Sequence, residues 1–441
     1  MTSILPEQET PALLGGPKAV PTSWEQDWPI IEQDEIEVVV DLMKRRVLSI
    51  YDRSGIIAEF EDAFAKVHQL NGVTPYALSH SSGTSALHAA YFGVGIGPGD
   101  EVIVPTYTFL ATVMPILQCC GIPIFADMDR NTLTLDPNDV EQRITSRTQA
   151  VVVTHMWGHP ADMERLVSIC EKHNLALIED CSHAHGATYR GQLVGTFGDV
   201  GCFSLEGHKA IVAGEGGILI TKDRRIYERA LLLGHFGRRI KDEIQLPEHR
   251  PFLETGLGHK YRMHPLAAGI ALVQLGKLFE RNEMRRRNLD YMSEQLKGIP
   301  GVEPPVTLPH VTRGGFYGYK PRFIREEIPE LDMESYLKAL IAEGVQAKRP
   351  GSKPLHLLPT FQIDQRTERS MKLPWAYPGA FPQRKYQPGS LPVAEAVYPT
   401  LISLPTFTIP SKERIDQYAV SFRKVARHTG AIAEWWRKEL K

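Results

Sequence analysis

The 441-residue chain lacks the features that mark secreted, membrane-spanning or nucleic-acid-binding proteins. Its five cysteines are scattered without a C-x-x-C pair, which argues against a disulfide framework or a zinc site and predicts reduced thiols in a cytoplasm. No apolar run approaches the roughly 18 residues that suggest a membrane span, and the N-terminus has no signal-peptide pattern. The formal net charge of −2 gives no overall attraction to nucleic acid or anionic membrane.

Short apolar segments alternate with helical patterns over most of the first 280 residues. This alternation predicts an α/β fold with a mostly parallel sheet and helices on both faces. One such helix is expected over 162–173. The segments expected to form strands of one sheet are 101–105, 122–126, 150–154, 176–179, 201–204 and 217–221.

Changes in composition divide the chain into three parts. An arm rich in Pro and Gly (1–25) precedes a large domain (26–280), and a smaller α+β domain follows (281–441). The smaller domain should contain a strand at 317–323, a helix at 333–343 and a final helix near 412–439. Its Pro-rich insert, about 350–405, is too long for a turn, and such segments are often functional or pack on a neighbour.

One lysine is distinguished by its surroundings. Lys209 lies five residues after Ser204 and shortly before the turn Gly214-Glu-Gly-Gly217, and Asp180 ends an apolar strand upstream. An amine that can form a Schiff base and a carboxylate that can pair with a pyridinium nitrogen are what pyridoxal 5'-phosphate (PLP) chemistry requires. The freed amine would then move a proton on the substrate, a task for which burial would lower its pKa.

A cluster of small residues, Ser82, Gly83 and Thr84, precedes a good helix-forming segment. Backbone N–H groups at such a helix start, together with the helix dipole, can bind a phosphate. The alternative is a plain N-cap by Ser82 or Thr84. The lysine and aspartate described above favour the phosphate, to which Ser204 could add a hydroxyl unless it simply ends a strand.

Two further side chains are candidates for contact with the cofactor ring. Phe109 could stack on one face, although most aromatic residues at such positions belong to the core. His183 could reach the ring hydroxyl or orient Asp180, although a buried, hydrogen-bonded structural histidine is the default.

Two other patterns carry less weight. The glycine-rich segment 93–99 connects a helix to a strand, whereas a dinucleotide fingerprint requires strand, glycines and then helix. His155 and His159, with Asp162, have a spacing that could suggest a metal, but Gly158 and Pro160 favour a loop. We therefore expect no metal site.

These motifs resemble the DegT/DnrJ/EryC1/StrS aminotransferases, and the resemblance runs from about Gly15 to the C-terminal helix. It implies a PLP-dependent transferase of fold type I, in which Lys209 carries PLP, Asp180 pairs with the ring nitrogen and Phe109 stacks on the ring. Gly83, Thr84 and Ser204 would bind the phosphate.

The resemblance also implies a homodimer with shared active sites. The segment 258–263 is similar to a family segment that enters the neighbouring subunit's site. Many members have an asparagine there that reaches the partner's phosphate, and this chain has Lys260, which can donate a hydrogen bond with different geometry. The alternative is that Lys260 is an ordinary surface lysine.

Reaction and substrate follow from smaller differences within the family. Its sugar dehydratases replace the Schiff-base lysine by histidine; here His208 adjoins Lys209, but the spacing from Ser204 to the glycine-rich turn favours Lys209 and transamination. The segment 13–20 and the Pro-rich insert resemble members that aminate keto-cyclitols such as scyllo-inosose. We therefore expect transfer from L-glutamine or L-glutamate, through pyridoxamine 5'-phosphate, to a keto-cyclitol in natural-product biosynthesis.

Three alternatives remain open at this point. The acceptor could be a nucleotide-linked keto-sugar. The protein could be a PLP-binding regulator without turnover, or a PLP-dependent lyase or aldolase.

Overall fold

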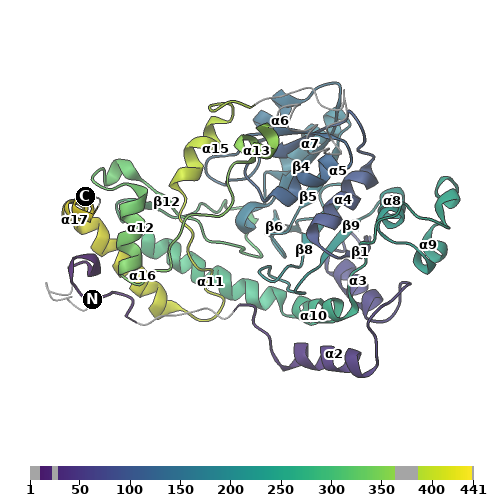
Figure 1. Cartoon of the computed structure of the whole chain (residues 1–441), viewed down its shortest axis with the longest axis horizontal. Coiled ribbons are helices and arrows are strands. Elements are labelled where there is room, and N and C mark those ends of the chain that lie inside the picture. Colours follow the sequence, from purple (N-terminus) through teal and green to yellow (C-terminus); the bar gives the residue numbers. More distant parts are fainter. Residues whose placement is uncertain (1–9, 22–27, 363–385, 440–441) are drawn as a thin grey trace.

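The computed structural model describes residues 10–21, 28–362 and 386–439. Figure 1 shows a large body, built on a sheet, beside a smaller and mainly helical unit that contains α12, α16 and α17. The long helix α11 (Leu278–Leu296) passes from one to the other. None of the described helices is long and apolar enough to cross a bilayer.

A seven-stranded sheet, in the order β1-β9-β8-β5-β4-β2-β3, forms the centre of the large body. Neighbouring strands among β3, β2, β4, β5 and β8 pair in parallel, whereas β9 is antiparallel to both of its neighbours. The prediction of a mostly parallel sheet is therefore confirmed. Its strands are β1 (Tyr76–His80), β2 (Glu101–Pro105), β3 (Ile122–Ala126), β4 (Thr148–Thr154), β5 (Ala176–Asp180), β8 (Val200–Ser204) and β9 (Gly217–Thr221).

Helices cover both faces of this sheet. In β4, Val152 packs in the core with α4 and α8, whereas Val151 and Val153 pack in the core with α6 and α7. Successive side chains of a strand point to opposite faces, so a strand covered on both sides is apolar throughout. The helices of this body are α2 (Gln33–Lys44), α3 (Gly55–Val67), α4 (Gly83–Val94), α5 (Met114–Gln118), α6 (Pro137–Arg143), α7 (Met163–His173), α8 (Arg224–Gly234), α9 (Arg238–Glu243) and α10 (Pro265–Gly276).

A second hydrophobic core lies in the C-terminal unit, between α11, α12 (Met333–Ala342) and α16 (Lys412–Arg427). The predicted domain boundary near residue 280 falls inside α11. Leu278 of this helix packs in a core of the large body, whereas Leu289 packs in the second core. Small strands complete the fold: β6 (Thr188–Tyr189), β7 (Gln192–Leu193), β10 (Val302–Glu303), β11 (Val311–Thr312) and β12 (Arg322–Phe323).

Two predicted elements of this unit differ in the structure. The strand expected at 317–323 is reduced to β12, because Pro321 has no N–H to donate to a ladder. The single helix expected near 412–439 is two helices, α16 and α17 (Thr429–Glu439), separated at His428. Thr429 and Gly430 have low helix propensity, and the break allows Ile432 of α17 to reach the second core.

The described part of the N-terminal arm lies on this chain's own C-terminal unit. The carboxylate of Glu343 accepts hydrogen bonds from the backbone N–H of Ala12 (2.7 Å) and Ala19 (2.9 Å), and it forms an ion pair with Lys424 (2.8 Å). Residues 1–9 and 22–25 of the predicted arm lie outside the described residues.

The described parts of the Pro-rich insert pack against the sheet. They contain α13 (Pro359–Gln362) and α15 (Pro392–Val397), which lie near α6 and α7 in Figure 1. His356 Nδ1 lies 2.6 Å from the hydroxyl of Thr106, directly after β2, and Asp127 Oδ1 accepts a hydrogen bond from the Ala394 N–H (2.8 Å). Residues 363–385 of the insert lie outside the described residues.

Candidate active site

A pocket of about 980 Å³ opens between the sheet and the C-terminal unit. Loops that follow the parallel strands form one wall, with Phe109 after β2, Trp157 after β4 and His208 after β8. Tyr317 and Lys320, from the C-terminal unit, contribute to another wall. Ligand sites of open α/β sheets lie at the carboxyl ends of the strands, so the pocket is where the fold favours one.

Lys209 lies in the turn after β8 and is only 8% exposed. Its Nζ atom lies 3.7 Å from the centre of the Tyr317 ring. Burial lowers the pKa of Lys209 to about 8, although Asp180 and Glu206 favour the charged form. A substantial fraction of this amine is therefore neutral near pH 8, as a nucleophile or general base requires. By contrast, the neighbouring His208 is exposed.

Asp180, at the end of β5, is buried and hydrogen-bonded on both oxygens. Oδ2 accepts from the Thr112 hydroxyl (2.7 Å) and Oδ1 from the Ser182 N–H (3.1 Å). The bond to Ser182 shows that Asp180 also stabilises the loop that follows β5. The Thr112 hydroxyl in turn lies 2.8 Å from that of Thr108, a pair that sequence reasoning missed.

The start of α4 is capped by a side chain, and its backbone at Gly83 lies close to Ser204. Ser82 is the N-cap: its Oγ accepts from the Ser85 N–H (3.1 Å), and the Ser85 hydroxyl accepts from the Ser82 N–H (3.0 Å), so the capping interpretation of Ser82 is confirmed. A Cβ atom at Gly83 would lie 2.7 Å from Ser204 Cβ, so only glycine lets the helix start approach Ser204 this closely. The N–H groups of Gly83 and Thr84, beside the Ser204 hydroxyl, fit a phosphate.

His183 is buried beside two aromatic rings. Its ring stacks on Tyr317 (centres 4.2 Å apart) and on Trp157 (5.1 Å), and its Nδ1 atom has no hydrogen-bond partner among the described residues. Burial, with Lys209 nearby, holds the pKa of His183 well below its usual range, so the ring is neutral. An unpartnered buried nitrogen is costly unless a ligand satisfies it, which fits a cofactor with a polar ring substituent.

The remaining residues of the pocket differ in how visible they were in the sequence. Phe109 is 55% exposed and lines the pocket, so it is not the core residue considered as an alternative. Trp157 lies in the loop whose histidines, His155 and His159, suggested a metal, and nothing in the sequence distinguished Trp157 itself. Tyr317 had no sequence signal, because a separate unit of the chain supplies it.

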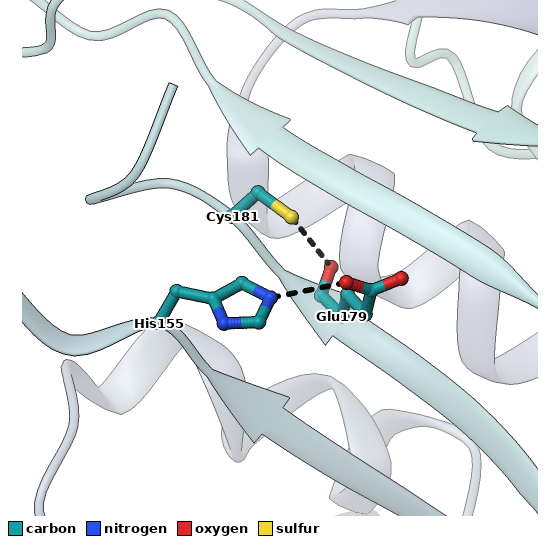
Figure 2. Close-up of side chains that lie close together, drawn as sticks. All are labelled: His155, Glu179 and Cys181. Atoms are coloured by element: carbon teal, nitrogen blue, oxygen red, sulfur yellow. Dashed lines mark hydrogen bonds and ion pairs between the residues drawn. The ribbon is translucent and has the colours of Figure 1, made fainter. Parts of the chain in front are cut away.

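His155, Glu179 and Cys181 bring possible metal-ligand atoms within 4.8 Å of one another (Figure 2). The Glu179 carboxylate, however, interacts with His155 Nε2 (3.1 Å) and accepts three backbone N–H bonds, from Gly195, Phe197 and Gly198 (each 2.8 Å). Burial raises the pKa of the Cys181 thiol well above its usual range, which disfavours the thiolate that a metal needs. We therefore assign this cluster a structural role in holding the end of β5. His159 instead lies beside the Pro160 carbonyl (2.6 Å).

Lys260 lies outside this pocket. It is exposed, in a segment held by a hydrogen bond from the Ser81 N–H to the Tyr261 carbonyl (2.6 Å). The other predicted site residues lie at or just after the carboxyl ends of the sheet strands, whereas Lys260 lies on the surface of the same chain.

The sheet, the pocket at its carboxyl edge and the buried lysine define the class of PLP-dependent aminotransferases of fold type I. The chain belongs to the DegT/DnrJ/EryC1/StrS aminotransferase family, whose model matches residues 29–379.

Relatives and solved structures agree with this membership. The chain is 33% identical to the GDP-perosamine synthase of Escherichia coli O157:H7, over 83% of this chain and 89% of that protein. It is 32% identical to the L-glutamine:2-deoxy-scyllo-inosose aminotransferase of Streptomyces kanamyceticus, over 85% and 86%. The crystal structure of DesI with its TDP-sugar product matches with a TM-score of 0.77 and 26% identity, over 98% of this chain and 99% of that chain.

Proposed function

We propose that the chain uses PLP to move an amino group from L-glutamine or L-glutamate to the keto group of a cyclitol or sugar. The observation that carries the proposal is the buried amine of Lys209, with its lowered pKa, close to the pocket at the carboxyl ends of β2, β4 and β8. We also expect a cytoplasmic location, because all five cysteines are free thiols.

Bound PLP would supply an electron sink for removal of a proton next to the transferred nitrogen. Asp180 would hold a positive charge on the ring nitrogen, and His183 Nδ1 would contact a ring substituent. Phe109 would cover one ring face. The N–H groups of Gly83 and Thr84 and the hydroxyl of Ser204 would bind the phosphate, whereas the Ser82 side chain is used for the helix cap. Lys209 would hold the cofactor and then transfer the proton.

The acceptor class is the finer part of the proposal. Relatives named for scyllo-inosose derivatives support a keto-cyclitol, and the relative named GDP-perosamine synthase supports a nucleotide-linked keto-sugar. The described flanks of the Pro-rich insert also line the pocket, through Leu355, Leu358 and Pro405. They would therefore help to select the acceptor.

A spectral half-reaction assay tests the proposal. Wild-type protein loaded with PLP should absorb in the visible range, L-glutamine or L-glutamate should bleach the band, and a suitable ketone should restore it. Scyllo-inosose and a GDP-linked keto-sugar should be compared as acceptors. Absence of a band in the presence of PLP would contradict the proposal. A band that no amino donor bleaches would favour a regulator, and a band lost without transfer to any ketone would favour a lyase.

We further propose a homodimer in which Lys260 contributes to the partner's site. Arg262, two residues along, stacks over Tyr51 (4.9 Å to the ring centre) and lies near Phe236 (5.9 Å), and both aromatic side chains are exposed. Helix α2 also exposes Ile36, Val40 and Met43, which recur at helical spacing. Exposed apolar side chains grouped in this way are typical of a protein interface.

Subunit mixing tests this arrangement. Lys209→Ala and Lys260→Ala should each lower activity, the second by about tenfold through weaker phosphate binding. A heterodimer of the two variants should regain activity, because one of its sites receives an intact Lys209 and an intact Lys260 from different subunits. If Lys260 served its own subunit, both sites would be damaged and mixing would restore nothing. Sedimentation of each variant checks that dimers persist.

A further inference from the structure

The pocket described above has a cationic wall. Among its lining residues in the described chain are Arg285, Lys320, Lys348 and Lys353, and none is Asp or Glu. Arg285 is buried and donates to neutral acceptors, the Thr408 hydroxyl (2.9 Å) and the Gly315 carbonyl (2.7 Å). A pocket lined by one sign of charge attracts ligands of the opposite sign.

Lys320 is the buried member of this wall, only 7% exposed. Its Nζ donates a hydrogen bond to the Ser403 hydroxyl (2.7 Å) and lies 4.3 Å from the centre of a Trp157 ring. No described carboxylate forms an ion pair with it. Burial, with Lys348 nearby, lowers the pKa of Lys320 to about 7. A buried amine without a counter-charge is unfavourable in its ionised form, and a bound anion would relieve this cost.

The backbone is adapted to hold this amine in place. Ser403 and Lys348 exchange backbone hydrogen bonds (2.7 and 3.2 Å), which fixes the strand-like segment that carries the Ser403 hydroxyl. A Cβ atom at Gly318 would lie 2.4 Å from Lys320 Nζ and 2.8 Å from Lys320 Cε. The absence of a side chain at Gly318 therefore creates the space in which the lysine folds back over Trp157.

We propose that Lys320 and Ser403 form a binding site for an anionic oxygen group, a carboxylate or a phosphate, of a substrate in this pocket. The proposal rests on the proposed aminotransferase function. The Trp157 ring under Lys320 is almost parallel to the Tyr317 ring under Lys209 (7°, centres 5.9 Å apart). Because Trp157 and Tyr317 also both stack on His183, the two amines lie over one group of stacked rings. A substrate whose nitrogen or keto carbon is at Lys209 could therefore extend to the anion site.

Two substrates could supply the anion in turn. The amino donor carries a carboxylate next to its reacting nitrogen, and a nucleotide-linked acceptor carries phosphates. In a ping-pong reaction both occupy the same pocket at different times, so the two half-reactions separate the sources.

The experiment measures each half-reaction of the PLP-loaded protein by its visible band. Lys320→Met removes the charge, Lys320→Arg keeps it, and Gly318→Ala displaces the amine without removing it. Lys338→Met, an exposed lysine on α12 outside the pocket, is the matched control. We expect Lys320→Met to lower kcat/KM about 10- to 100-fold in one half-reaction, as loss of a hydrogen bond to a charged group does. Gly318→Ala should lower kcat/KM of the same half-reaction, and Lys320→Arg should lower it less than Lys320→Met does.

The affected substrate identifies the anion. If kcat/KM falls only for L-glutamine, the bound anion is the carboxylate of the amino donor. If kcat/KM falls only for the GDP-linked keto-sugar and is unchanged for scyllo-inosose, the bound anion is a phosphate. Inorganic phosphate should also inhibit the wild type competitively and the Lys320→Met variant more weakly. The proposal is overturned if the variants keep the band and react with all three substrates at wild-type rates. If the wild type gave no band, the proposed function itself would have failed, which is a different result. Should Lys320→Met not fold, Gly318→Ala provides the same comparison with the charge retained.

Discussion

Replacing Lys209 with alanine is expected to abolish the visible band that PLP gives with the wild type and to lower turnover by about 10⁴-fold. The variant loses both the amine that binds the cofactor covalently and the base that transfers the proton. The fold should persist, because removing a buried amine that has no described hydrogen bond leaves no partner unsatisfied. The measurements are the absorption spectrum after PLP addition and the rate with L-glutamine and each ketone.

His208→Ala is the matched control for that substitution. His208 adjoins Lys209 but is exposed, so its loss should leave the visible band in place. If His208→Ala lost the band and Lys209→Ala kept it, the assignment of the reacting residue would be wrong.

The pH dependence of cofactor loading follows from the same lysine. Only the neutral amine attacks the aldehyde of PLP, and burial lowers the pKa of Lys209 to about 8. The rate of band formation should therefore rise with pH, reach half its maximum near pH 8 and level off above that. Stopped-flow measurements between pH 6 and 10 test this, and a rate still rising steeply at pH 10 would indicate an ordinary, exposed lysine.

Asp180→Asn is expected to lower kcat by about 10²- to 10³-fold while leaving PLP bound. Asparagine has nearly the same shape, and its oxygen can still accept a hydrogen bond from Thr112 or Ser182. What it loses is the negative charge that would keep the ring nitrogen protonated. The test is kcat together with the spectrum of the bound cofactor, because a change in ring protonation shifts that spectrum.

Thr112→Val separates charge from positioning. This substitution removes the 2.7 Å hydrogen bond to Asp180 Oδ2 but keeps the carboxylate. We therefore expect kcat to fall by about tenfold, as for the loss of a single hydrogen bond. If Asp180→Asn kept turnover within about twofold of the wild type, Asp180 would be only the loop-stabilising residue that its bond to Ser182 suggests.

Local sequence patterns predicted those elements whose stabilising contacts lie within one short segment of the chain. Six of the seven strands were predictable because both faces of the sheet are covered, which makes these strands largely apolar, as at Val151–Val153. The strand β1 was not predicted, because the buried polar residues Ser79 and His80 interrupt its apolar run. The cap at Ser82 was predictable because its partner is three residues away. The single helix expected near the C-terminus was wrong because the break at His428 depends on the packing of Ile432 in the second core as well as on the low helix propensity of Thr429 and Gly430.

The sequence by itself determined the class of fold, the family and the lysine and aspartate around which the site is built, since those residues follow strand ends whose position is encoded locally. Only the tertiary structure decided what surrounds them. Tyr317 and Lys320 come from a unit more than 100 residues further along the chain, and Glu179 is committed to the backbone of Gly195–Gly198 and not to a metal. The physical reason is that such contacts depend on how two separately formed hydrophobic cores pack together, and no local pattern records that packing.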